Sequence, residues 1–264
     1  MNRIDAKFRQ LKKSGGKAFI AFITAGYPDL ETTYKLILEF SRIGVDILEL
    51  GVPFSDPIAD GPVIQEASQA ALKAKVNLKD ILRLVRRVRR KTGIPICLMT
   101  YYNPVYCFGE AKFVKDASGS GVDGLIIPDL PPEEAGSLLG CARRCGLDTI
   151  FFISPTSSDK HIRLISKASG GFIYYVSLTG TTGARSSIAQ DFLKNLQNIK
   201  KITSKPVCAG FGISTPQQVK YVCGIADGAI IGSAIVKKIR ENLKRRDLVK
   251  RVGRYVNYLK GRNV

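Results

Sequence analysis

The sequence predicts an α/β protein built as a single (β/α)8 barrel of the TIM type, with an extra helix at the N-terminus. Three observations favour this fold: eight short apolar segments recur, amphipathic segments alternate with them, and most connections are too long for hairpins. Eight such units match the size of a closed parallel barrel. The alternative is a doubly wound open sheet, but no Gly-x-Gly-x-x-Gly follows the first strand. Because no low-complexity linker divides the chain, we expect one domain over residues 1–264.

The eight expected strands are short apolar runs that end in polar or glycine-rich segments. In chain order they are AFIAFI (18–23), DILEL (46–50), ICLMTY (96–101), DGLII (123–127), DTIFFI (148–153), FIYYVS (172–177), PVCAG (206–210) and DGAII (227–231). Runs of this kind are typical of parallel strands that are buried on both faces by helices.

The segments between the strands carry apolar residues three or four positions apart, which predicts amphipathic helices. They lie at 31–43, 62–73, 78–91, 110–119, 132–145, 159–168, 188–201, 215–223 and 234–260, with the last one broken near Arg246. Residues 2–13 are expected to form the helix that precedes the first strand.

The net charge of +19 is concentrated in two segments, residues 83–91 and 237–264. Apolar residues recur in both at helical spacing, so the basic side chains are expected to line solvated outer faces. A basic face can bind nucleic acid through phosphates, but neither segment carries interleaved aromatic residues or a known reader motif. We therefore expect no nucleic-acid partner.

Membrane and metal functions find little support in the composition. No apolar run approaches the ~18 residues of a membrane span, and the first residues lack the apolar core of a signal peptide. A cytoplasmic location is expected.

The chain has six cysteines without a C-x-x-C pair and a single histidine, His161. Cys141 and Cys145 lie one helical turn apart, but further ligands are lacking, so we expect no metal site.

Glycine-rich turns follow the last two expected strands. Gly210 and Gly212 come after the seventh strand, and Gly232 and Ser233 follow the eighth just before a helix. Glycines let backbone N–H groups approach an oxyanion, and in this fold the same two turns usually hold a phosphate. The alternative is that these are only tight turns, with Ser214 and Ser233 capping helices.

Two carboxylates flank the connection after the second strand. Strand alternation puts Glu49 on the same face as Ile47, in an apolar setting that raises a carboxyl pKa toward the range useful for proton transfer. Asp60 follows on a loop stiffened by prolines. The alternatives are a Glu49 paired with a nearby Lys or Arg, and an Asp60 that only begins the helix at Pro62.

The loop at 178–187, LTGTTGARSS, has the composition of a lid that closes over a substrate, although a plain exposed loop has it too. Just before it, Tyr174 and Tyr175 end the sixth strand. Alternation allows one of these two tyrosines to face the barrel interior and to offer a hydroxyl there.

The chain strongly resembles the tryptophan synthase α-subunit family. The run LELGVPFSDPIADGPVIQ at 48–65 is similar to the signature of that family. The resemblance extends along nearly the whole chain, through AFITAGYPD (21–29), the spacing at 104–113, GLIIPDLPPEE (125–134), YYVSLTGTTGAR (174–185), CAGFGIS (208–214) and GSAIVKKI (232–239).

The resemblance implies a carbon–carbon lyase of tryptophan biosynthesis that cleaves indole-3-glycerol phosphate to indole and glyceraldehyde 3-phosphate. It implies catalysis by Glu49, Asp60 and Tyr174, with Tyr175 the less favoured tyrosine. Matching positions imply phosphate binding by Gly183, Gly210, Gly212, Gly232 and Ser233, an indole pocket at Phe22 and Tyr101, a lid threonine at Thr182, and partner contacts at Asp56, Asn103 and Pro131.

The same resemblance implies no metal or organic cofactor on this chain. Pyridoxal phosphate is expected only on a β-subunit partner, which receives the indole in an αββα heterotetramer. Two residues depart from the family pattern: Leu178 stands where many relatives carry Arg, and Tyr102 is bulky for its site. A non-catalytic α subunit that only activates its partner is the alternative function, and a free-standing indole-releasing lyase is a third.

Overall fold

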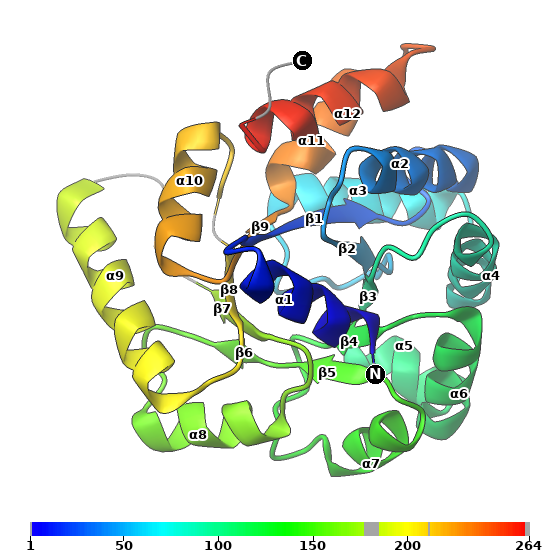
Figure 1. Ribbon diagram of the computed structural model, residues 1–264. Coiled ribbons are helices and arrows are strands. Elements are labelled where there is room, and N and C mark those ends of the chain that lie inside the picture. The colour runs from blue at the N-terminus through cyan, green and yellow to red at the C-terminus, as the bar shows by residue number, and fades with distance from the viewer. Residues whose placement is uncertain (1, 177–184, 211, 262–264) are drawn as a thin grey trace.

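The computed structural model describes residues 2–176, 185–210 and 212–261, and of residues 185–191 it describes the backbone alone. Within these ranges one sheet holds nine strands, all paired in parallel, in the order β5-β4-β3-β2-β1-β9-β8-β7-β6 (Figure 1). The strands are β1 Ala18–Thr24, β2 Ile47–Gly51, β3 Ile96–Met99, β4 Gly124–Ile126, β5 Asp148–Ile150, β6 Phe152–Ile153, β7 Ile173–Val176, β8 Val207–Gly210 and β9 Gly228–Ile231.

The two ends of this strand order close on each other. Only Phe151 separates β5, which pairs with β4, from β6, which pairs with β7. The single strand expected at 148–153 is therefore divided into two short pieces that together occupy one position of the barrel. The eight-unit α/β barrel predicted from the sequence is confirmed.

The helices surround the strands (Figure 1). In the described ranges they are α1 Arg3–Lys13, α2 Leu30–Arg42, α3 Pro62–Lys73, α4 Leu78–Arg89, α5 Tyr102–Phe108, α6 Glu110–Ser120, α7 Gly136–Arg144, α8 Asp159–Ala168, α9 Arg185–Ile202, α10 Pro216–Ile225, α11 Ser233–Glu241 and α12 Leu248–Leu259. The long last helix breaks as expected, between Glu241 and Leu248. One expected start was wrong, since α7 begins at Gly136 and not at residue 132. One helix, α5, was not predicted.

Local sequence explains why most of these helices form where they do. The side chain of Asn77 accepts a hydrogen bond from the backbone N–H of Asp80, and Asp80 accepts one from Asn77 in return, which caps α4. Apolar side chains at Leu78, Ile81 and Val85 are then buried on one face of the helix. Thr215 caps α10 in the same way as Asn77 caps α4.

Buried apolar residues form two cores. The larger core lies between the strands and the surrounding helices and includes Leu48 and Leu50 of β2. The smaller core fills the barrel interior and includes Ile47 of the same strand. Alternation along β2 therefore places residues 47 and 49 toward the interior, as the sequence predicted for Glu49.

Helix α1 covers the amino-terminal end of the barrel, the end that faces the viewer in Figure 1. Its Ile4 and Phe8 belong to the interior core, and the ring centroids of Phe8 and Phe172 are 5.8 Å apart. Burial of these side chains explains why residues 3–13 form a helix although most of that helix is polar.

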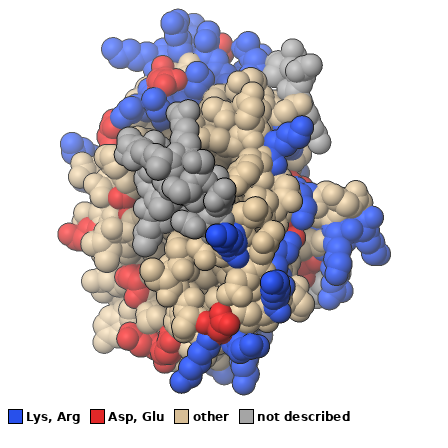
Figure 2. All heavy atoms as spheres, turned by 90° about the vertical axis from the view of Figure 1, so that its left-hand side faces the viewer, with Lys and Arg blue, Asp and Glu red and all other residues tan. Residues whose placement is uncertain are grey.

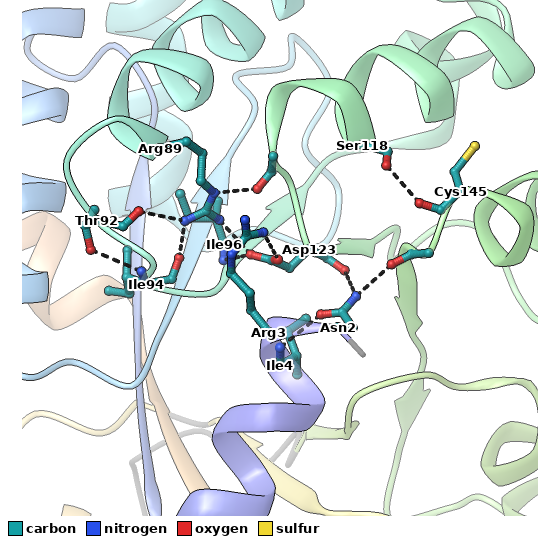
Figure 3. Close-up of polar contacts among 12 residues, drawn as sticks. Asn2, Arg3, Ile4, Arg89, Thr92, Ile94, Ile96, Ser118, Asp123 and Cys145 are labelled. Atoms are coloured by element: carbon teal, nitrogen blue, oxygen red, sulfur yellow. Dashed lines mark hydrogen bonds and ion pairs between the residues drawn. The ribbon is translucent and has the colours of Figure 1, made fainter.

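A polar network fastens the start of α1 to the barrel (Figure 3). The Asn2 side chain donates to the carbonyl oxygens of Asp123 at 2.7 Å and of Gly146 at 2.9 Å. The Asp123 carboxylate accepts from Arg3 at 2.8 Å and from Arg89 at 2.6 Å. The expectation that the basic residues of 83–91 all lie on a solvated face was wrong for Arg89, because its side chain is only 11% exposed and is paired with this buried acid.

The other basic residues of that segment that form salt bridges do lie at the surface. Arg83 pairs with Asp80, and Arg87 pairs with Glu31 while its guanidinium lies 3.8 Å from the centre of the Tyr34 ring. Figure 2 shows Lys and Arg gathered at the top of the molecule, over α11 and α12, and along its right-hand edge. No helix in the described ranges is long and apolar enough to span a bilayer.

Candidate active site at the carboxyl end of the barrel

Glu49 lies in the middle of the sheet, with Phe22 of β1 and Cys97 of β3 as its neighbours in register. Its side chain is 0% exposed, and neither carboxylate oxygen has a hydrogen-bond partner. Burial raises the pKa of Glu49 to about 8, because an ionised carboxylate is poorly solvated there. The alternative of a Lys or Arg partner is wrong, since no cation reaches Glu49 among the described residues.

Asp60 lies on the loop between β2 and α3. Its backbone N–H donates to the carbonyl of Pro57 at 3.0 Å, and its carbonyl accepts from the side chain of Gln65 at 2.9 Å. Burial raises the pKa of Asp60 to about 6, while a hydrogen bond from Tyr101 acts in the opposite direction. The N-cap position of α3 is Gly61, just before Pro62, and it makes no side-chain hydrogen bond, so Asp60 does not serve as the cap of that helix.

Tyr101 fixes the loop that carries Asp60. Its hydroxyl accepts a hydrogen bond from the backbone N–H of Ala59 at 2.9 Å, and its ring stacks on Phe54 with centroids 5.1 Å apart. Tyr101 is only 4% exposed, and burial raises the pKa of its phenol, with the Asp60 carboxylate as the next cause. Phe54 was missed in the sequence, where only its apolar character in a proline-rich loop could have singled it out.

The ring of Tyr174 lies against Phe152 inside the barrel, with centroids 4.8 Å apart. Burial raises the pKa of the Tyr174 phenol, and the charges of Glu49, Cys208 and Asp60 raise it further. The phenol thus lies within electrostatic reach of both carboxylates, and the structure brings the three predicted catalytic side chains together. Tyr175 points away from the interior and packs on Phe192, so Tyr174 is the tyrosine that faces the site.

Phe22 lies between two glycines. A β-carbon at Gly51 would be 2.6 Å from the ring of Phe22, and one at Gly232 would be 3.5 Å from it. The first distance is too short for any side chain at residue 51. Phe22 is therefore held beside both Glu49 and the turn after β9, as a wall of the predicted indole pocket requires.

The turns after β8 and β9 lie side by side because these two strands pair. A β-carbon at Gly210 would be 2.8 Å from the Tyr174 hydroxyl, and Gly212 has φ of +45°, which favours glycine. Gly232 is the N-cap of α11 and makes no side-chain cap hydrogen bond, and Ser233 is the first residue of that helix. The alternative that Ser214 and Ser233 only cap helices is wrong: Thr215 caps α10.

The remaining predicted site residues fall into two groups. Thr182 and Gly183, together with the departure Leu178, lie outside the described residues. Asp56, Asn103 and Pro131 are exposed, on the loops or helices that follow β2, β3 and β4.

Two large apolar side chains accompany the exposed group of Asp56, Asn103 and Pro131. Ile58 is 84% exposed and Tyr106 is 70% exposed. The second departure, Tyr102, lies close by and donates its hydroxyl to Glu110 at 3.0 Å. In the described ranges, no three His, Cys, Asp or Glu side chains lie together as a metal ion would need.

The comparisons with known proteins agree with this geometry. The family model described as tryptophan synthase alpha chain matches residues 8–260. The chain belongs to the tryptophan synthase alpha chain family. The resemblance seen in the sequence is confirmed, and with it a carbon–carbon lyase of tryptophan biosynthesis that catalyses the α reaction on indole-3-glycerol phosphate.

Relatives in this family match over almost the whole chain. The tryptophan synthase alpha chain of Geotalea daltonii is 52% identical over 241 residues, 91% of each chain. That of Geobacter sp. strain M21 is 48% identical over 260 residues, 98% of this chain and 97% of the relative.

Solved structures of the family superpose closely on the barrel. A tryptophan synthase subunit alpha from Legionella pneumophila has a TM-score of 0.93 at 36% identity and covers 99% of this chain and 98% of its own. A chain of the tryptophan synthase complex from Pyrococcus furiosus has a TM-score of 0.84 at 36% identity, covering 92% and 98%.

Proposed function

We propose that Glu49 and Asp60 carry out the retro-aldol cleavage of indole-3-glycerol phosphate as an acid–base catalyst and an electrostatic stabiliser. The observation that supports this assignment is the separation of their pKa values, about 8 and about 6, around one phenol. Near pH 7 one carboxyl is then mostly protonated and the other mostly ionised, which is the division of roles that the reaction needs.

Glu49 moves the protons. The bond between C3 of the indole and the glycerol chain breaks only after C3 has been protonated, because the indolenine that results accepts the electron pair of that bond. Protonated Glu49 supplies this proton and becomes a carboxylate. The same carboxylate then takes the proton of the substrate hydroxyl on the glycerol carbon that was bonded to C3, as that carbon becomes the aldehyde. Glu49 is therefore protonated again at the end of the cycle.

Asp60 stabilises the charge. Protonation of C3 places positive charge on the indole nitrogen, and a fixed carboxylate near that atom lowers the energy of the intermediate. The hydrogen bond between Tyr101 and Ala59, together with the bond from Gln65, holds the loop in place, so little reorganisation accompanies the step. Tyr174 contributes a hydroxyl within electrostatic reach of both acids.

The glycines position the substrate from its far end. Gly210, Gly212, Gly232 and Ser233 offer backbone N–H groups and the positive end of α11 to the phosphate. Binding free energy at the phosphate is thereby used to orient the reacting carbon. We further propose that Gly183 and Thr182 complete this grip and the lid.

A β subunit is the proposed receiver of the indole. The Pyrococcus furiosus neighbours are described as a tryptophan synthase complex and as an a2b2 complex. The exposed Asp56, Asn103 and Pro131, with the apolar Ile58 and Tyr106 nearby, form a surface suited to such a contact. We propose that pyridoxal phosphate belongs to that partner and that this chain uses no cofactor of its own.

A cytoplasmic location completes the proposal, and the six free cysteines are in keeping with a reducing compartment. Fractionation of the source cells, followed by detection of the chain in each fraction, tests this location. Recovery in a membrane or secreted fraction would contradict it.

The decisive experiment is cleavage of indole-3-glycerol phosphate by the isolated chain and by the chain mixed with a β subunit. We expect release of indole by the wild type, a loss of about a thousandfold or more in Glu49→Gln, and little change in the binding of glycerol phosphate. A wild type without cleavage that still stimulates its partner would favour the non-catalytic alternative. Full activity alone, with no complex on gel filtration, would favour the free-standing lyase.

A further inference from the structure

A pocket lies at the opposite end of the barrel from Glu49 and Asp60. It has a volume of about 460 Å³ and is bounded by α1, the end of α9 and the segments that lead into β1, β8 and β9. These segments all lie at the amino ends of strands, whereas the candidate active site lies at the carboxyl ends. A volume of this size suits a small-molecule ligand.

Four lysines from four different segments line this pocket. Lys12 lies on α1, Lys17 precedes β1, Lys200 lies in the last turn of α9, and Lys205 lies on the turn before β8. Sequence spacing does not bring them together, since 193 positions separate the first and the last. The barrel fold is what gathers these four lysines around one hollow.

One acid, Asp227, is part of the lining, and its carboxylate already accepts three hydrogen bonds. Its carboxylate accepts from Lys200 at 2.8 Å, from Lys17 at 3.2 Å and from the backbone N–H of Val207 at 3.0 Å. Burial alone would raise the pKa of Asp227, but the bonds from Lys200 and Val207 lower it, so this acid is ionised at neutral pH. The four lysines and one aspartate leave a net charge of 4 − 1 = +3.

Two of the lysines remain without a salt bridge. Within the described part of the chain, the ammonium groups of Lys12 and Lys205 reach no carboxylate oxygen, although Lys205 interacts electrostatically with Asp148. Like charges held around one hollow repel each other, and a bound anion relieves that repulsion. One wall, with Phe8, is apolar, and the exposed Ser204 adds a hydroxyl at the rim.

We propose that this lysine pocket binds a multiply charged phosphate compound through a pyrophosphate group. The charge of +3 and the spread of the lysines around the hollow fit two linked phosphates better than one. A pyrophosphate group can be inorganic or part of a nucleoside diphosphate, whose organic part would lie on the wall with Phe8. The site is separate from the substrate phosphate turns at Gly210 and Gly232.

Isothermal titration of the full chain with inorganic pyrophosphate, and in parallel with ADP, tests the proposal. We expect the double variant Lys12→Gln/Lys205→Gln to bind pyrophosphate at least about tenfold more weakly than the wild type. Tighter binding of ADP than of pyrophosphate would identify a nucleoside diphosphate as the ligand, and equal binding would identify the inorganic group.

The matched control is Lys13→Gln/Lys201→Gln, which removes the same charge from exposed neighbours that do not line the pocket. We expect this control to bind pyrophosphate within about twofold of the wild type. Equal weakening in both double variants, or binding that neither changes, would overturn the proposal. Cleavage of indole-3-glycerol phosphate should stay at the wild-type level in both variants, so this test is independent of the catalytic assignment. If the double variant folds poorly, the single variant Lys205→Gln replaces it in the pyrophosphate titration.

Discussion

The hydroxyl of Tyr101 accepts a hydrogen bond from the backbone of Ala59, one residue before the carboxylate of Asp60. The same hydroxyl bonds to that carboxylate and opposes the rise in its pKa. A residue that the family resemblance assigns to the indole pocket thus also helps to fix where Asp60 lies and how easily it ionises.

Tyr101→Phe removes these two hydrogen bonds and keeps the ring. We expect kcat/KM to fall about tenfold or somewhat more, because the two hydrogen bonds together contribute roughly 1–2 kcal/mol. We also expect the pKa of Asp60 to rise above its present value of about 6. The pH dependence of kcat/KM measures both effects. Phe54→Leu, which removes only the ring stack, is the control and should leave that pKa in place.

The wild-type pH profile should be bell-shaped. Asp60 must be ionised and Glu49 protonated, so kcat/KM is expected to rise as the pH increases through about 6 and to fall as it increases through about 8. Initial rates between pH 5 and 9.5 with a mixed buffer check this expectation. A flat profile across that range would contradict the division of roles between the two acids.

Glu49→Gln should change the pH dependence of stability. The pKa of Glu49 is about 8 in the folded protein, above its usual 4.5, so the folded state holds this proton more tightly. Wild-type stability therefore falls as the pH rises from about 4.5 to about 8, whereas the variant lacks this loss.

Thermal unfolding at pH 5 and pH 8.5 checks the Glu49 linkage. We expect the Tm of Glu49→Gln minus that of the wild type to be more positive at the higher pH. The exposed Glu134→Gln is the control and should show no such change. An equal difference at the two pH values would show that burial does not hold the proton on Glu49.

Gly210→Ala should disturb Tyr174. The added β-carbon would lie 2.8 Å from the hydroxyl and 3.2 Å from Ile230, so the ring must move, at a cost of about 1–3 kcal/mol in unfolding free energy. We expect Tyr174→Phe to restore part of this stability in the double variant, because the nearest clash is with the hydroxyl. Urea unfolding of the wild type, the two single variants and the double variant gives the coupling free energy between the two substitutions. Purely additive changes in unfolding free energy would argue against the contact.

Asp123→Asn should loosen the amino end of the barrel. It leaves the side chain of Arg89, which is 11% exposed, without its carboxylate, and such a break costs about 3 kcal/mol. Arg3→Gln removes the other partner, which is 48% exposed, and should cost less than about 1 kcal/mol. Denaturant unfolding measures both, and similar losses in the two variants would contradict a special role for the buried pair.

Strand and helix periodicity predicted most of the fold, because a barrel repeats the same βα unit along the chain. Strand alternation alone placed Glu49 inside, and capping residues such as Asn77 marked the starts of helices. The unbroken apolar run at 148–153 gave no sign that β5 and β6 separate at Phe151.

Features that depend on distant residues could not be predicted. Helix α5 has no apolar periodicity, and its first N–H, that of Tyr102, is satisfied by the carboxylate of Asp129 from the next βα unit at 2.9 Å. In the sequence Arg89 is indistinguishable from the surface cations around it, because only the fold brings Asp123 beside it. In the site, the glycine turns and the two acids were visible in sequence, but the bond from Tyr101 to the Asp60 loop was not, since 42 positions separate Ala59 and Tyr101.

Ala59 lies between a solvent-facing isoleucine, Ile58, and the carboxylate that we propose for charge stabilisation, Asp60. Ile58 projects 84% into water, yet the next N–H along the chain is tied to Tyr101. A protein surface that docks on Ile58 must therefore restrict the same short stretch of backbone that aims Asp60. We therefore expect assembly to affect turnover through this rim of the barrel, without a rearrangement of the packed strands.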